Sequence, residues 1–212
     1  MSFWITDKAL EWVEAAESEA GQPADAVWAS QLVSADLMRW SRWWIGLGAF
    51  VIAFFAAGTA GTLGMALLVE SPNYLIALAA LLAVAVAALA VCAVVLWRLH
   101  RSGRRLARAL RWWLALRAGV IPDQGIAGWI APRAVLFKPV VFVRVLTGTL
   151  AGLIGIFGLT AIGYSVTEEA VLLLASVSWG LLGTACCLGQ FGAVMRLVSG
   201  LADADPLWST VR

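Results

Sequence analysis

The sequence predicts an all-α integral membrane protein in which four helices cross the bilayer. Hydrophobic residues make up 62% of its 212 residues and charged residues only 13%, whereas roughly a quarter of the residues in soluble domains are charged. A soluble core cannot absorb so much apolar surface, so lipid must solvate much of it. Four apolar segments each exceed the ~20 residues that one crossing requires: residues 44–69, 75–97, 140–164 and 170–195. Backbone N–H groups in hydrocarbon must bond within their own segment, so we expect helices.

The segment before the first span, residues 1–43, is acidic and amphipathic. It holds seven Asp or Glu residues against three Lys or Arg. Two helical pieces with apolar sides are expected here, one that Thr6 can cap and one over residues 24–40, separated by "GQP". Because an anionic membrane repels acidic helices, either a cationic segment holds these pieces or they form a solvated tail.

Residues 44–97 are predicted to form the first transmembrane hairpin. Its first span contains Gly58 and Gly61, small residues of the kind that let helix backbones approach closely in a membrane. The second span has no glycine, so we expect it to face lipid or to pack loosely.

The loop at residues 98–139 sets the predicted orientation. It holds nine Lys or Arg residues and one acid, Asp123, whereas the connections at 70–73 and 165–169 hold no Lys or Arg. Because basic loops stay in the cytoplasm, the sequence predicts a multi-pass protein of the inner (plasma) membrane with both termini cytoplasmic.

The same basic loop also has the pattern of an amphipathic helix. Leu99, Leu106, Leu110, Trp113 and Leu114 recur at helical spacing, and arginines occupy much of the rest. Such a helix is typical of the membrane interface, and Gly103 is a possible bend. Alternatively, the arginines only set topology and the leucines pack on the helix ends. The predicted contacts with anionic lipid or with a partner are Arg98, Arg101, Arg104, Arg105, Arg108 and Arg111.

Residues 140–196 are predicted to form the second transmembrane hairpin, followed by a short cytoplasmic tail at 197–212. Arg144 is the one charged residue within the four spans. It is expected to snorkel to the cytoplasmic surface, or to bind a carboxylate or a lipid phosphate between helices. The further glycines predicted to pack helices are Gly148, Gly152, Gly155, Gly180 and Gly183. The tryptophans predicted to anchor the protein at the interface are Trp40, Trp43, Trp44, Trp97, Trp112 and Trp113.

The residues of catalysis and of cofactor or metal binding form no recognisable pattern. The one histidine, His100, stands among arginines, and the three cysteines lie within spans. No HExxH motif and no paired carboxylates within the spans occur. We therefore expect no enzyme, no cofactor and no metal site. Nucleic acid is not an expected partner, because no recognition fold accompanies the arginines.

These features favour a non-enzymatic subunit or scaffold of a larger membrane assembly, such as a secretion, transport, respiratory or sensing complex. Its expected partners are anionic lipids and other membrane subunits, or further copies of itself. The alternative is a homo-oligomeric channel or small transporter, with Glu70, Glu168 and Glu169 at its mouth; a lipid-handling enzyme is the third possibility. Thirteen arginines against two lysines fit a GC-rich bacterial genome.

Overall fold

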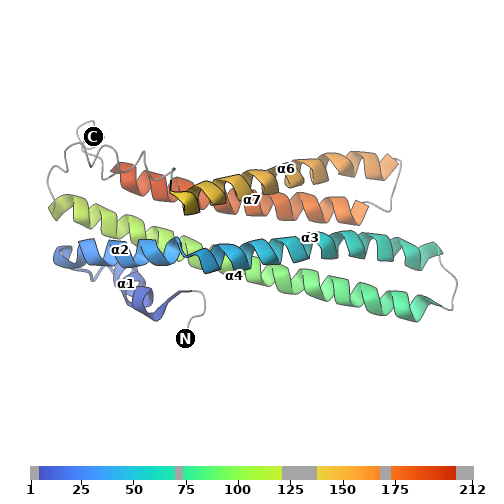
Figure 1. Cartoon of the computed structure of the whole chain (residues 1–212), viewed down its shortest axis with the longest axis horizontal. Coiled ribbons are helices and arrows are strands. Elements are labelled where there is room, and N and C mark those ends of the chain that lie inside the picture. The colour runs from blue at the N-terminus through green and yellow to red at the C-terminus, as the bar shows by residue number, and fades with distance from the viewer. Residues whose placement is uncertain (1–4, 70–73, 121–137, 168–172, 204–212) are drawn as a thin grey trace. The chain divides into compact units, whose positions relative to one another are not determined.

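The computed structural model describes residues 5–69, 74–120, 138–167 and 173–203, and every regular element within these ranges is a helix (Figure 1). The N-terminal elements are α1 (Asp7–Glu17), a 3-10 helix (Pro23–Asp25) and α2 (Ala26–Leu37). The long helices are α3 (Trp40–Val69), α4 (Leu75–Val120), α6 (Pro139–Thr167) and α7 (Leu173–Asp203). These four are long and apolar enough to cross a membrane, so the prediction of an all-helical chain with four helices that could span a membrane is confirmed.

Helix α1 has an extended residue at its N-cap and a left-handed residue just after its C-cap. Thr6 is extended at the N-cap, as predicted, although its hydroxyl makes no capping hydrogen bond. At the other end Glu19 has a φ of 54°, a left-handed conformation in which glycine is more usual. The amide of Ala20 donates to the carbonyl of Ala15 at 3.0 Å, which closes a Schellman turn and satisfies a carbonyl at the helix end.

The described chain divides into two compact units. The terminal unit comprises residues 1–43, 98–145 and 190–212, and the span unit comprises residues 44–97 and 146–189.

The terminal unit has a hydrophobic core to which α1, α2, α4, α6 and α7 all contribute. Its buried residues include Val13 of α1, Val33 of α2, Trp113 of α4, Val141 of α6 and Leu197 of α7. The N-terminal segment is therefore packed against the arginine-bearing part of α4 and is not a solvated tail.

The span unit exposes many large apolar side chains. Ile76 is 87% exposed and Phe157 is 70% exposed, as expected for helices whose solvent is lipid. A small buried cluster joins Ala49 and Ala53 of α3 to Cys92 of α4, and these two helices lie side by side (Figure 1). The span over residues 75–97, which has no glycine, is largely exposed in this chain.

The structure differs from the predicted separate interfacial helix over residues 98–119. Helix α4 continues without a break through Gly103 and has 46 residues in all. Its rise of ~1.5 Å per residue gives a length of about 69 Å, about twice the thickness of a bilayer's hydrocarbon core. The apolar side chains that predict an interfacial helix, Leu106, Leu110, Trp113 and Leu114, are covered by protein in the terminal unit.

Candidate docking surface

The second half of α4 has one buried face and one charged face. Leu106, Leu110, Trp113 and Leu114 are between 0% and 7% exposed. Their helical spacing places them on one side of α4, and the arginines between them fall on the other. Burial of one face therefore fixes the direction in which the arginines point.

Among the described residues of the terminal unit, Trp113 is the largest fully buried side chain. Its indole nitrogen donates a hydrogen bond of 2.9 Å to the backbone carbonyl of Trp12 in α1, and the two indole rings meet edge to face with centroids 5.6 Å apart. The bond satisfies the polar atom of an otherwise apolar side chain. Trp113 thus joins α1 to α4, a role that its position in the sequence does not reveal.

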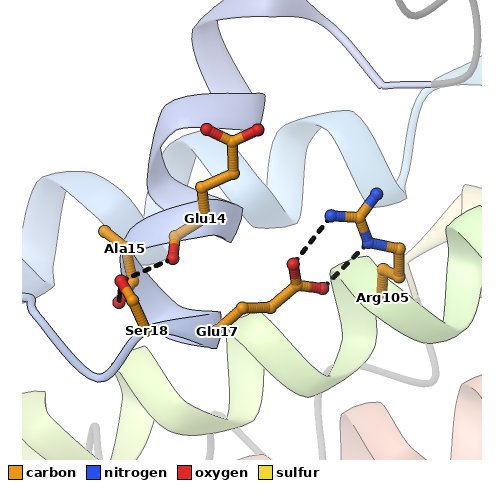
Figure 2. Close-up of polar contacts among 5 residues, drawn as sticks. All are labelled: Glu14, Ala15, Glu17, Ser18 and Arg105. Carbon is orange, nitrogen blue, oxygen red and sulfur yellow. Dashed lines mark hydrogen bonds and ion pairs between the residues drawn. The ribbon is translucent and has the colours of Figure 1, made fainter.

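Glu17 and Arg105 form the ion pair between α1 and α4 (Figure 2). The guanidinium group donates two hydrogen bonds, from Nε to Oε1 at 2.8 Å and from Nη2 to Oε2 at 2.7 Å. The hydrogen bond from Arg105, opposed by partial burial and aided by the charges of Arg105 and Arg108, lowers the pKa of Glu17. Because the side chains are 43% and 35% exposed, we expect the pair to contribute only about 0.2–1 kcal/mol, less than the apolar core.

Three of the predicted contact arginines form what we call the arginine stripe: Arg101, Arg104 and Arg108. All three are exposed, and they make no salt bridge to any residue within the described ranges. Arg98 and Arg111 extend the same side of α4 and are also exposed. Arg105 instead forms the ion pair with Glu17. Of the six arginines predicted to contact lipid or a partner, five therefore keep their side chains exposed on the surface.

His100 lies beside this basic surface. Partial burial, followed by the charges of Arg104 and Arg196, lowers the pKa of His100. The imidazole is therefore neutral at pH 7 and adds no charge to the stripe.

Arg42 is buried at the start of α3, just before the first predicted span. Its Nη2 donates to the hydroxyl of Ser102 at 2.7 Å and to the carbonyl of Leu99 at 3.4 Å, so it ties α3 to α4 within the terminal unit. Burial is the main reason that the pKa of Arg42 falls to about 10, where the side chain remains charged at pH 7. Nothing in the sequence pairs Arg42 with Ser102, because the two residues are far apart in the chain.

Arg144 holds the end of α2. Its Nη2 donates a 2.6 Å hydrogen bond to the backbone carbonyl of Leu37, the last residue of that helix. A cation at a helix C-terminus also interacts favourably with the helix dipole. The sequence alone does not predict this contact with Leu37.

The predicted packing glycines of α6 and α7 face one another. A side chain at Gly155 would place its Cβ 2.7 Å from the backbone nitrogen of Thr184, and one at Gly152 would reach Sγ of Cys187 at 2.9 Å. Gly183 packs directly on Gly155, and Gly180 is in close contact with Leu159. Gly148 of α6 is buried as well, and so is Gly61, the predicted packing glycine of α3. The backbones of α6 and α7 can therefore approach closely because these positions carry no side chain.

Gly58 of α3 packs against Trp179 of α7. The Trp179 ring stacks on Phe54 with centroids 4.9 Å apart, and its nitrogen donates a 2.8 Å hydrogen bond to the Phe54 carbonyl. A groove lined by Gly58, Thr59 and Trp179 runs beside this contact. The sequence marks Trp179 only as a tryptophan in the middle of a span, so its partner was not foreseen.

The six tryptophans predicted as interfacial anchors fall into two groups. Trp40, Trp44 and Trp97 are 43%, 61% and 67% exposed, as contact with lipid headgroups requires, and Trp43 packs edge to face against Trp40. Trp112 and Trp113 contact each other and the core of the terminal unit. Those two side chains serve packing in this structure.

The groups that could hold a metal ion are dispersed in the part of the chain that the structure describes, where no cluster of three or more His, Cys, Asp or Glu side chains occurs. The three cysteines are not bonded to one another.

Comparison with family models, with curated proteins and with solved structures finds no match to this chain.

Proposed function

We propose that the protein is a non-enzymatic subunit of a larger membrane assembly, and that the arginine stripe of α4 docks an acidic partner protein. The observation that carries the proposal is the exposure of Arg101, Arg104 and Arg108 on a helix whose opposite face is buried. A row of cations along a helix gives complementarity and orientation to a binding surface. Arginines on a flexible loop would also lose backbone conformational entropy on binding.

The length of the basic surface favours a protein over a lipid as its main partner. From Arg101 to Arg111 the helix rises about 15 Å. The headgroup layer of one leaflet is only about 5–7 Å thick. An acidic helix or extended segment of a protein can follow such a row along its full length. We therefore propose that a segment of this kind binds the arginine stripe.

The proposed topology places both termini and residues 98–139 in the cytoplasm and forms two transmembrane hairpins, α3 with α4 and α6 with α7. Its support is the excess of arginine in residues 98–139 and the lack of Lys and Arg in residues 70–73 and 165–169. In a bacterium this membrane is the inner membrane. The arginine stripe then faces the cytoplasmic side, where subunits of secretion, transport, respiratory or sensing complexes are accessible.

Site-specific photocrosslinking tests the docking surface. A photoreactive amino acid replaces Arg104, Arg108 or, as a matched control, the exposed Gln31 of α2 in the same unit. After illumination in cells and purification in mild detergent, we expect adducts to one common protein from positions 104 and 108 and none from position 31. The double variant Arg104→Glu and Arg108→Glu should lose that partner, whereas Gln31→Glu should keep it.

The mass of the adduct separates the functional alternatives. An adduct with a different protein supports the subunit role, and its sequence identifies the assembly. An adduct of two copies of this 22.5 kDa chain would instead favour the homo-oligomeric channel. Equal adducts from positions 31, 104 and 108, or none at all, would contradict docking on the stripe.

A further inference from the structure

The groove beside Trp179 lies between α3 and α7, within the span unit. Its volume is about 380 Å³, within the range of ~300–1,000 Å³ that is typical of ligand pockets. The described residues that line it are aromatic or small and carry no charge. They include Phe54, Phe55, Gly58, Thr59 and Thr62 of α3 and Trp179 of α7.

Trp179 is held in place as one wall of the groove. Its ring stacks on that of Phe54 at an angle of 18°, and its indole nitrogen donates a 2.8 Å hydrogen bond to the Phe54 carbonyl. Gly58 permits this close packing, since a Cβ there would lie only 3.1 Å from Cζ2 of Trp179. The groove is therefore preformed, which lowers the entropy cost of filling it.

The polar side chains of the groove already have hydrogen-bond acceptors. The hydroxyl of Thr59 donates to the carbonyl of Phe55 at 2.9 Å, and that of Thr62 donates to the carbonyls of Thr59 at 3.0 Å and Gly58 at 3.3 Å. The indole N–H of Trp179 is also bonded, so each side-chain donor among the described lining residues is in use. Such a lining suits a hydrocarbon better than a polar ligand.

The groove lies at the depth of acyl chains in the proposed four-span protein. Along α3, Thr62 and Phe55 are about 10 and 21 Å from Val69, the last residue of that helix. The hydrocarbon core of a bilayer is about 30 Å thick. Both residues therefore lie within hydrocarbon, whichever way the chain is oriented.

The groove is too small to hold a transmembrane helix. From Phe55 to Thr62 it follows α3 for about 10 Å. A helix segment of that length, with a diameter of about 10 Å, takes up about 800 Å³, roughly twice the volume of the groove. A single hydrocarbon chain is narrower than a helix. In a concave groove it contacts more protein atoms than it would on a convex surface, which strengthens dispersion attraction.

We propose that this groove binds one acyl chain of a membrane lipid. The rings of Phe55 and Trp179 and the bare backbone at Gly58 contact the chain from several sides. In the proposed topology the lipid belongs to the outer leaflet, because Val69 is at the outer end of α3. The proposal depends on α3 and α7 crossing the membrane, and it is independent of docking on the arginine stripe.

Photolabelling by a lipid tests this proposal. The full chain is reconstituted in phosphatidylcholine nanodiscs that contain a small fraction of phosphatidylcholine with a diazirine in the middle of one acyl chain. After illumination, peptide mass spectrometry locates the adducts. Phe55 and Phe157 are 66% and 70% exposed, so Phe157 of α6 reports ordinary contact with lipid. We expect Phe55 and Trp179 to carry severalfold more adducts than Phe157.

A larger side chain in the groove should displace the acyl chain. Thr59→Phe should lower the labelling of Trp179 severalfold, and so should Thr62→Phe, which makes the test independent of the stability of either variant. The matched control is Thr160→Phe in α6. Thr160 is also exposed, and its hydroxyl donates to the carbonyl of Ile156 at 3.0 Å, as Thr59 does to Phe55. This variant should keep the wild-type labelling of Trp179.

A photoreactive amino acid at Thr59 separates lipid from protein as the occupant. In cell membranes we expect its adducts to be with lipid. Adducts with a second copy of this 22.5 kDa chain, or with another protein, would overturn the proposal. It is also overturned if Phe55 and Phe157 are labelled equally, or if both groove-filling variants leave the labelling of Trp179 unchanged.

Discussion

Trp113 and Glu17 hold α1 on α4 by different means. The indole of Trp113 is fully buried and hydrogen-bonded to α1, and burial of such a ring stabilises a fold by several kcal/mol. The pair of Glu17 with Arg105 is exposed and contributes far less. Attraction between the acidic segment and the basic segment is thus a minor part of their association, and apolar packing is the major part.

The Glu17–Arg105 pair predicts a specific dependence on pH. A carboxyl group whose pKa is lower in the folded state than the ordinary 4.5 binds protons more readily when unfolded. Its contribution to stability is therefore complete above the unfolded pKa and is lost as the pH falls through the folded pKa. We expect Glu17→Gln to lower the Tm slightly at pH 7 and to have no effect well below pH 4.5.

The matched control for this prediction is Glu11→Gln, an exposed residue of the same helix. It should change the Tm by less than Glu17→Gln does at pH 7. A Glu17→Gln effect of the same size at both pH values would contradict an ionic origin.

Individual residues of the docking surface were predictable only in part. Helical spacing correctly separates the leucine face of α4 from its arginine face, because the period of a helix can be read from the sequence. The covering of that face by Val13, Val33 and Val141 could not be read in this way. Contacts such as Arg42 with Ser102 and Arg144 with Leu37 depend on how distant segments fold together, and a single sequence carries no signal for them.

Among the elements, α4 departs most from expectation. The sequence changes from apolar to basic at Arg98, but the helix does not end there. Arginine, alanine and leucine are all strong helix formers, and no proline interrupts residues 75–120. One helix therefore serves the span unit and the terminal unit alike.

Close packing of α6 on α7 predicts which glycines tolerate a side chain. Gly155→Ile should force the helices apart, because its Cβ would lie 2.7 Å from the backbone nitrogen of Thr184. Overpacking of this kind costs about 1–3 kcal/mol or more, so we expect a clear fall in the Tm in detergent. Gly163→Ile lies on the same helix with nothing within 4 Å of its Cβ and should change the Tm little. Equal effects of the two variants would show that α6 and α7 do not meet at Gly155.

At the scale of the whole molecule, composition and segment length were sufficient to predict a four-span helical membrane protein. Each segment's length and apolar composition are enough to decide whether it can span a bilayer as a helix, without reference to the rest of the chain. A packed terminal unit formed from residues 1–43, 98–145 and 190–212 was not predictable, because it assembles three separate parts of the chain. The proposed partner of the arginine stripe could not be predicted either, because its identity depends on a second molecule.

The proposed topology and docking role both depend on the side of the membrane on which the terminal unit lies, and cysteine labelling measures that side directly. In a variant whose native Cys92, Cys186 and Cys187 are replaced by alanine, single cysteines are placed at Gln31, Asn73 or Thr167. A membrane-impermeant maleimide should label positions 73 and 167 in intact cells, and position 31 only after the membrane is permeabilised. Labelling of position 31 in intact cells, with positions 73 and 167 protected, would place the arginine stripe outside and contradict the proposed cytoplasmic docking role.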